Sequence, residues 1–477
     1  MIRNTILIIF LTASSGGFSQ EFNYWTNQVG AKSSMLSGAV TAADLDNSSI
    51  YYNPGTLGFN QNSSLSLSSD SYYLGWNSIE NGAGKGLNPM SLEMNVFPQI
   101  IAYNQKVPKI PVTVTLAAVT RNSSVINMGS RNEMSRNLID ELPGNEYYVG
   151  TFSYYNRMRD NWIGIGYGEC FGEYFGIGGS VFFSIKNMEY QYQQSADVYK
   201  NNSDTSKFNL VASSLSGDYF NMKNIGVIFM VGFSYRREKF KIGLNFNMPR
   251  INVRFIGRSD LRRSVMFIEQ GSDSLSQNYS VWQQEVKSTF KTPFSVDLGL
   301  EFSISKSTKL FTKISWFAPV AEYAMIITGG EQTPMSTALT NYDPEFSNIY
   351  LANRSVLNAA IAMETKVSEK ISVLAGFRTD FNYFDRNAFD LNSDFYPGIS
   401  YWDIYHFTGG IVWRQDKFDL SLGGSYSLGR DSSLPQIVNL SDPVRENHYF
   451  GVPDNSAKAR YNQVSIFFGF TYYFPRN

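Results

Sequence analysis

The sequence predicts an all-β protein: a fourteen-stranded antiparallel transmembrane β-barrel with an N-terminal hatch in the lumen. Three observations support this fold class. Many segments alternate apolar and polar side chains, as Phe418, Leu420 and Leu422 do with Asp419 and Ser421, which is the period of a strand. The connections between these segments are by turns short and long. After the N-terminus, no stretch is apolar for the roughly 18 residues that a transmembrane helix needs.

Residues 1–19 are expected to be a secretory signal peptide. Arg3 supplies the positive start, residues 6–11 form the apolar core, and Gly17 and Ser19 are small residues near the expected cleavage site. An uncleaved membrane anchor is the weaker alternative, because the apolar run is too short to span a bilayer. An exported chain of amphipathic strands is expected in the outer membrane of a Gram-negative bacterium.

Residues 20–62 do not follow the strand rhythm. The stretch 30–44 is small and weakly apolar, and Asn53-Pro54-Gly55 follows it as a turn signal. We expect this segment to lie inside the lumen as a hatch, with Asn53, Pro54 and Gly55 holding its turn. The alternative is an ordinary turn before the first strand.

The barrel is expected to occupy residues 63–477, with short periplasmic turns and long extracellular loops. The expected strands, in chain order, are 63–76, 91–105, 111–121, 147–170, 174–190, 223–236, 240–256, 288–304, 308–324, 353–366, 370–384, 402–414, 417–429 and a last strand that ends at Phe474. The long loops are expected at 122–146, 191–222, 257–287, 326–351, 385–401 and 431–460. We expect 147–170 to be one strand interrupted near Arg159-Asp160-Asn161, because two strands would make the total odd.

The last strand carries aromatic residues at alternate positions, among them Phe468, Phe470 and Tyr472. Outer-membrane barrels present such a terminal strand to the barrel assembly machinery, which is therefore an expected partner. A soluble β-sandwich is the alternative, but glycine and serine crowd the face opposite the aromatic residues, which favours a barrel. We expect the barrel to be a monomer.

Composition excludes several classes of function. The net charge is −1, so no global basic field recruits nucleic acid. Cys170 is the only cysteine, and His406 and His448 are the only histidines, so we expect no metal site and no cofactor. A lipase at the rim would need a serine within hydrogen-bond reach of His406 or His448. No serine of the sequence stands out as such a nucleophile, so we expect no catalytic residues.

The N-terminal segment resembles a known family. A Gly/Ala-rich stretch with an acidic residue, followed by Tyr-Asn-Pro-Gly-Thr-Leu-Gly at 52–58, is similar to the hatch of the FadL family of outer-membrane transporters for long-chain fatty acids and other hydrophobic compounds. This family includes the TodX-like hydrocarbon channels. The segments 231–236, 240–249 and 292–300 continue the resemblance through the barrel, and the family likewise has fourteen strands.

The resemblance implies passive, hatch-gated diffusion of a hydrophobic molecule, with an exit through the wall near a kink of the third strand. No bulge is evident in 111–121, but Pro98 in the neighbouring strand cannot donate a ladder hydrogen bond and is a candidate for the opening. The alternative is that the strand begins after Pro98. A porin-like channel or a structural barrel remains the alternative function.

Strand parity places Lys186, Lys241 and Arg378 in the lumen, where they are candidates for binding a ligand carboxylate. The alternative is a network that braces the hatch against the wall. Lipids and lipopolysaccharide of the outer membrane are further expected partners. Arginines near one outer strand end are suited to lipopolysaccharide phosphates, although ordinary solvated charge would explain them too. These arginines are Arg254, Arg258, Arg262 and Arg263.

Overall fold

The computed structural model describes residues 22–60, 62–107, 112–200, 209–253, 258–270, 277–328, 348–388 and 398–475. The expected signal peptide, residues 1–19, lies outside them. Within the described ranges, no helix is long and apolar enough to cross a membrane.

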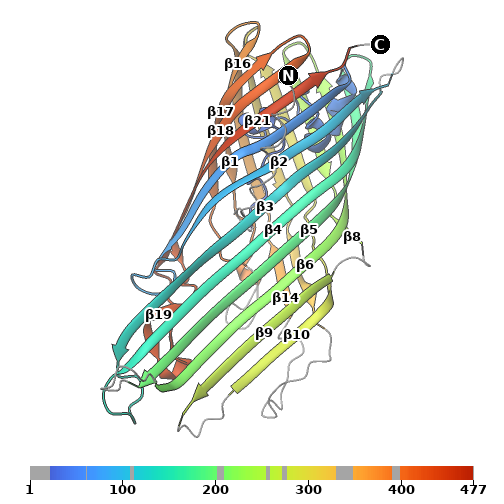
Figure 1. Ribbon diagram of the computed structural model, residues 1–477. Helices are drawn as coiled ribbons and strands as arrows, with labels where there is room; N and C mark the ends of the chain where they lie inside the picture. Colours follow the sequence, from blue (N-terminus) through green and yellow to red (C-terminus); the bar gives the residue numbers. More distant parts are fainter. Residues whose placement is uncertain are drawn as a thin grey trace, which may run out of the picture.

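The chain forms a closed antiparallel barrel of 14 strands, as predicted (Figure 1). Its first six strands are β1 (Ser64–Glu80), β2 (Met90–Lys106), β3 (Val112–Arg136), β4 (Glu146–Phe171), β5 (Phe175–Lys200) and β6 (Asn209–Arg236). The next four are built in pieces: β7 (Phe240–Asn247), β8 (Ile251–Asn252) and β9 (Arg258–Glu269); β10 (Gln277–Ser288) and β11 (Ser295–Ser303); β12 (Thr308–Phe317) and β13 (Val320–Ile327); β14 (Ile349–Asn353) and β15 (Val356–Lys366). The last four are β16 (Ile371–Asp380), β17 (Ile404–Arg414), β18 (Phe418–Leu434) and β21 (Ala457–Tyr473). β1 pairs with both β2 and β21, which closes the barrel.

Four neighbouring strands of the wall are interrupted, where we expected continuous strands. Pro249, Pro293 and Pro319 lie in three of the interruptions, between β7 and β8, between β10 and β11, and between β12 and β13. A proline cannot donate a ladder hydrogen bond, which explains why pairing stops there. Arg250 fills the first interruption, since its guanidinium donates to Asn224 Oδ1 of β6 and to the Ser184 carbonyl oxygen of β5.

Five strand segments on one side of the barrel run much farther than expected (Figure 1). We expected loops at 122–146, 191–222 and 257–287, but most of these residues continue β3, β5, β6, β9 and β10, whereas β4 has nearly the expected bounds. The expected interruption of β4 near Arg159-Asp160-Asn161 is also wrong, because β4 pairs with β5 without a register shift. A strand needs about 9–11 residues to cross a bilayer, so much of the 28-residue β6 lies beyond the membrane.

A change of the apolar face explains why these extensions were missed. Near the short turns, apolar side chains such as Ile163 and Phe183 point outward and are 56% exposed, as a lipid-facing surface requires. Farther along the same two strands, Tyr154 and Tyr190 point inward and are buried, while Gln191 is exposed on the outer face. The alternation continues, but its apolar side now faces the interior of the extension.

The N-terminal segment, residues 22–60, lies inside the barrel (Figure 1). It contains two short helices, α1 (Ala31–Met35) and α2 (Ser49–Tyr52), and the 3₁₀ helix η1 (Pro54–Phe59). α1 contacts β16, β17, β18 and β21, whereas η1 contacts β3 to β7. Met35, Leu36, Ile50 and Leu57 are fully buried between the segment and the wall.

Glycines of the wall let the backbone of η1 approach the sheet directly. A Cβ atom on Gly232 of β6 would lie 2.0 Å from Asn53 Oδ1, and one on Gly178 of β5 would lie 2.2 Å from the Pro54 carbonyl oxygen. On the side of η1, a Cβ on Gly55 would lie 2.6 Å from the Gly232 carbonyl oxygen. No side chain fits between the two backbones, so both partners must be glycine.

We predict that Gly232→Val loosens the N-terminal segment by about 1–3 kcal/mol, because the added side chain overlaps Asn53 and the η1 backbone. The loss is measured as faster proteolysis of residues 22–60 in detergent and a lower unfolding temperature. Gly179→Val is the matched control, since the nearest heavy atom to its Cβ, Met230 O, is 3.5 Å away. Equal behaviour of the two variants would contradict the close contact.

Candidate functional site

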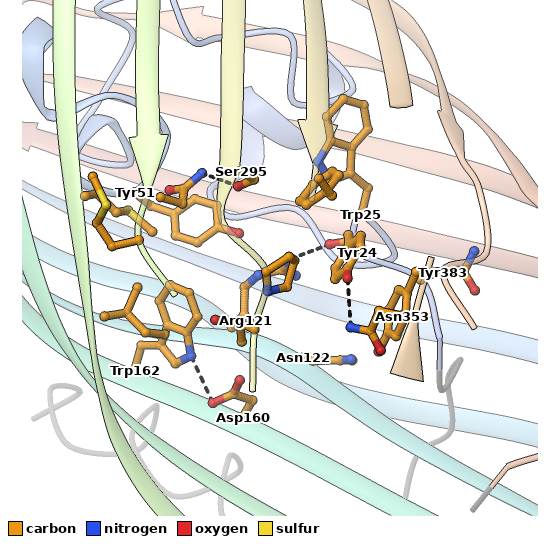
Figure 2. A pocket seen from close by; sticks show the side chains of 18 of the residues that line it. Tyr24, Trp25, Tyr51, Arg121, Asn122, Asp160, Trp162, Ser295, Asn353 and Tyr383 are labelled. Atoms are coloured by element: carbon orange, nitrogen blue, oxygen red, sulfur yellow. Dashed lines mark hydrogen bonds between the residues drawn. The ribbon is translucent and has the colours of Figure 1, made fainter. Parts of the chain in front are cut away.

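A cavity of about 130 Å³ lies between the N-terminal segment and the wall (Figure 2). Its aromatic lining residues are Tyr24, Trp25, Tyr51, Tyr52, Trp162, Phe290, Phe317 and Tyr383. Met248 and Pro293 also line it, so the cavity lies where the wall strands are interrupted. A concave space that combines these aromatic side chains with a few charged ones, such as Arg121 and Lys186, is suited to a small apolar molecule with a polar group.

The start of the N-terminal segment closes one side of this cavity. The ring of Tyr24 stacks on Phe317 and on Tyr383, with centroid distances of 4.2 and 4.1 Å. Asn353 donates to the Tyr24 hydroxyl at 3.0 Å, and the Arg121 guanidinium donates to the Tyr24 carbonyl (Figure 2). These contacts hold the segment to both sides of the barrel.

The two carboxylates in the cavity wall already have partners. Asp160 accepts a hydrogen bond from Trp162 Nε1 at 2.9 Å, and Lys313 Nζ lies 3.3 Å from Asp297 Oδ1 (Figure 2 shows the first). Asp297 is thus paired with a cation, whereas Asp160, within the described ranges, accepts hydrogen bonds from neutral donors only and lies opposite Lys186 in the β4–β5 ladder.

Lys186, one of the three cations predicted to face the lumen, lines the cavity and is buried. Its Nζ is 2.9 Å from Met158 Sδ and 3.9 Å from the centroid of the Phe290 ring. It forms no ion pair with a carboxylate of the described ranges. A buried ammonium with a thioether and a ring as neighbours can accept an anionic group from a ligand.

The other two predicted cations contact the N-terminal segment instead. Lys241 Nζ lies 2.5 Å from Asp44 Oδ1 and 3.2 Å from Glu301 Oε2. Arg378 donates to the carbonyl oxygens of Trp25 and Thr26 at 3.2 and 3.1 Å. Both cations therefore brace the N-terminal segment against the wall, which was the alternative to ligand binding.

Asn53, Pro54 and Gly55 lie at the junction of α2 and η1. Asn53 Nδ2 donates to Thr41 O at 2.7 Å and to Phe233 O at 2.9 Å, and its Oδ1 accepts from Gly55 N at 2.9 Å. Pro54 takes the first position of η1, where its missing N–H costs nothing. The Asn-Pro-Gly turn therefore ties two parts of the segment to β6.

The ladder between β2 and β3 stops close to Pro98. Paired residues run from Lys106 opposite Thr113 to Ile100 opposite Val119, and the described pairs end there. β2 continues to pair with β1, and β3 with β4, so both strands extend past the end of their common ladder. Farther along, the Asn127 N–H donates to Ser91 Oγ at 3.2 Å, which keeps the strands adjacent.

β3 has a bulge at this level, which sequence reasoning did not find. Its register against β4 shifts between Thr120 and Asn122, so Arg121 is the extra residue. The bulge brings the Arg121 guanidinium into the cavity and onto the Tyr24 carbonyl. An arginine next to Asn122 in an apolar strand is the only local signal, and it is weak.

His406 meets the distance condition for a lipase but lacks access to substrate. Ser427 Oγ lies 2.6 Å from His406 Nδ1, and Asp380 Oδ2 lies 3.7 Å from His406 Nε2. All three side chains are fully buried, and Asp380 accepts from Trp25 N at 2.9 Å. A nucleophile must reach its substrate, so this group acts here as an anchor for the N-terminal segment. In the described parts of the chain, no cluster of three metal-ligating side chains occurs.

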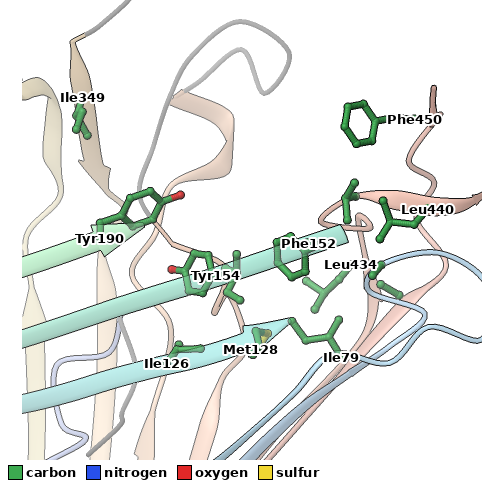
Figure 3. Packing of buried hydrophobic residues seen from close by; sticks show 14 of the residues in the cluster. Ile79, Ile126, Met128, Phe152, Tyr154, Tyr190, Ile349, Leu434, Leu440 and Phe450 are labelled. Atoms are coloured by element: carbon green, nitrogen blue, oxygen red, sulfur yellow. The ribbon is translucent and has the colours of Figure 1, made fainter. Parts of the chain in front are cut away.

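The connection between β18 and β21 covers the inside of the extended wall. We name residues 434–456 the outer cap; it contains β19 (Asn439–Val444), the 3₁₀ helix η4 (Arg445–Asn447) and β20 (Phe450–Gly451). Leu434, Leu440 and Phe450 of the cap belong to one apolar cluster with Phe152 and Tyr154 of β4 (Figure 3). The cap thus buries the inward apolar face of the extension.

Polar contacts fasten the outer cap. Arg445 Nη1 lies 2.8 Å from Glu141 Oε2, and Arg445 Nη2 lies 2.5 Å from Glu269 Oε1. The Tyr449 hydroxyl donates to Glu269 Oε2 at 2.6 Å. Although burial raises the pKa of Glu269, the hydrogen bonds from Arg445 and Tyr449 outweigh it and lower this pKa below its usual range.

Comparisons with known proteins support the fold. No family model matches the chain, and no curated protein sequence matches it. Among solved structures, the Pseudomonas putida toluene transporter TodX matches with a TM-score of 0.57 and 14% identity over 96% of this chain and 100% of that one. The CymD monoaromatic hydrocarbon channel gives 0.54 and 11% over 96% and 100%, and a Pseudomonas aeruginosa FadL homologue gives 0.55 and 12% over 97% and 100%. At these identities the likeness shows a common fold.

We predict that Arg445→Gln loosens the outer cap by about 1 kcal/mol, the usual scale for a partly exposed ion pair. Amide exchange of residues 439–444 should then rise about fivefold. Arg131→Gln, which breaks an exposed pair with Glu133 on β3, is the control and should leave this exchange unchanged.

Acid should loosen the cap of the unmodified protein in the same way. The pKa of Glu269 is lower in the folded protein than in the unfolded chain, where it is about 4.3. The stabilisation of the cap by ionised Glu269 is therefore complete above the unfolded pKa and is lost as the pH falls through the lower folded value. Amide exchange of residues 439–444, corrected for the intrinsic pH dependence, measures this. An effect of equal size in Arg445→Gln would show that the Arg445–Glu269 pair is not responsible.

Proposed function

We propose that this protein lets hydrophobic small molecules, such as long-chain fatty acid-like compounds, diffuse passively across the outer membrane, gated by its N-terminal segment. The observation that carries the proposal is the aromatic cavity enclosed between that segment and the wall, at the level where the β2–β3 ladder ends. A cavity closed by a separable segment can hold a ligand and release it when the segment moves.

The fold supports the same function. TodX is described as a toluene transporter and CymD as a monoaromatic hydrocarbon channel, and both share this barrel. The resemblance of residues 52–58 to the hatch of the FadL family points in the same direction. We therefore propose that the chain is a distant relative of that family.

The cavities suggest a route. A smaller cavity, lined by Phe22, Met188 and Leu351 among others, lies between the apolar cluster under the outer cap and the aromatic cavity, with which it shares Met158 and Tyr383. A hydrophobic molecule would pass from the outer cluster through both cavities. It would then leave sideways beside Pro98, where the β2–β3 ladder has ended.

A porin-like or structural barrel is the alternative. A porin needs a continuous polar path, whereas here the buried N-terminal segment occupies the lumen and contacts both sides of the wall. A rim-active lipase would need Ser427 to become accessible. Uptake of a hydrophobic compound by a strain with and without the protein, compared with permeation of a small sugar, separates transporter from porin.

We predict that a disulfide between the segment and the wall stops transport. Asn23 and Asn382 face each other in an isolated antiparallel bridge, so Asn23→Cys with Asn382→Cys should join the start of the segment to the wall just after β16. Uptake of a radiolabelled fatty acid should fall to the level of the deletion strain under oxidising conditions and recover with reductant.

A matched pair within the wall provides the control. Ser66 Oγ and Thr471 Oγ1 are 3.1 Å apart on β1 and β21, so Ser66→Cys with Thr471→Cys joins two wall strands and leaves the segment free. This variant should transport normally. If the locked variant transports as well as the control, gating by the segment is wrong; if the unmodified protein takes up no hydrophobic compound, transport itself is wrong.

We also propose that Lys186 binds the acidic group of a ligand. Lys186→Gln should weaken binding of a fatty acid about tenfold or more, the usual scale of a charge-assisted hydrogen bond. Binding of the corresponding fatty alcohol to the same purified variants is the control and should change little. Equal losses for acid and alcohol would show that Lys186 shapes the cavity without recognising charge.

A further inference from the structure

Positively charged residues form a row on the outer face of the extension. The register places Arg159 of β4 opposite Asn187 of β5, which lies opposite Lys223 of β6. Arg258 of β9 lies opposite Lys223, and Lys287 of β10 lies opposite Arg258. The row therefore crosses five neighbouring strands with one neutral member.

The row lies just outside the lipid-facing band. On β4, the side chain of Ile163 is 56% exposed, and Arg159 follows four residues farther from the short turn on the same face. On β6, Phe229 is 39% exposed, and Lys223 is the first charged residue beyond it on that face. Arg159 and Lys223 therefore lie at the level where the acyl chains of an outer leaflet end and its headgroups begin.

Three of these cations have no charged partner in the part of the chain that the structure describes. Arg159, Lys223 and Lys287 are exposed, and none forms an ion pair or side-chain hydrogen bond with the described residues. The acids near this row are Glu189, opposite Arg157, Asp260, opposite Asn221, and Glu285, two residues from Lys287 on β10. Like charges at directly opposite positions of a sheet are destabilising, so an anion bound outside the protein would stabilise this row.

We infer that this row binds phosphate groups of the outer-leaflet glycolipid, lipopolysaccharide. Neighbouring strands lie about 4.8 Å apart, so Arg159 and Lys223 are about 10 Å apart, as are Lys223 and Lys287. A glycolipid with several phosphates can contact several cations at this spacing, whereas a single free ion cannot bridge them. Its acyl chains would rest on the adjacent apolar band, which fixes the phosphates at the level of the row.

The test uses the full-length protein purified in detergent. Lipopolysaccharide added at increasing concentration should raise the unfolding temperature, and the triple variant R159Q/K223Q/K287Q should need at least tenfold more of it. K239Q/K306Q/K370Q removes three exposed lysines at the short turns and should behave as the unmodified protein. Unchanged binding by the first triple variant would overturn the proposal.

Two further ligands identify the source of the anion. Enzymatically dephosphorylated lipopolysaccharide should stabilise the protein less than the intact glycolipid, and equal stabilisation would overturn recognition of phosphate. Inorganic phosphate alone should have no effect at the same phosphate concentration; an equal effect would reduce the row to a general anion site and overturn the glycolipid. None of these outcomes depends on which molecule the barrel transports.

Discussion

The contact between the backbone of η1 and the glycines of the wall is the constraint on which the rest of the site depends. Gly55 lies against Gly232, and Pro54 lies against Gly178, with no room for a Cβ between them. This contact sets how deeply the N-terminal segment enters the lumen. Because the depth is set, Trp25, Tyr51 and Tyr52 meet the wall at the level where its strands are interrupted, and the cavity forms there.

Two different environments act on the same long strands. In the bilayer the apolar side chains must face outward, and the lumen side carries small residues that leave room for the N-terminal segment. Beyond the bilayer the outer face meets water, so the apolar side chains turn inward and are covered by the outer cap. The change occurs near Arg159 on β4, where the row of cations also begins, and the boundary of the membrane is thus encoded in the strand itself.

The barrel and its strand number were predictable because each strand carries its own alternation, and parity placed Lys186 in the lumen correctly. The extensions were not predicted because their apolar side chains face the interior, whereas those of the membrane-spanning part face outward, as Phe183 and Tyr190 of β5 show. Pro249, Pro293 and Pro319 were visible signals of the interruptions and were not used. The bulge at Arg121 depends on the registers of β2 and β4, and one strand's sequence does not contain that information.

The two ends of the N-terminal segment are held by different forces, and this decides which end can open the cavity. Residues 53–58 rest on glycines of the wall, where two backbones are in close contact. Any displacement separates these backbones, and no new contact replaces the one that is lost. Residues 22–26 are held by side-chain contacts, such as the stacking of Tyr24 on Phe317 and Tyr383, and by hydrogen bonds that water can replace one at a time. The Asn-Pro-Gly turn is therefore the fixed point. For the gating that we propose, this contrast favours opening at Tyr24, the end of the segment that faces the β3 bulge.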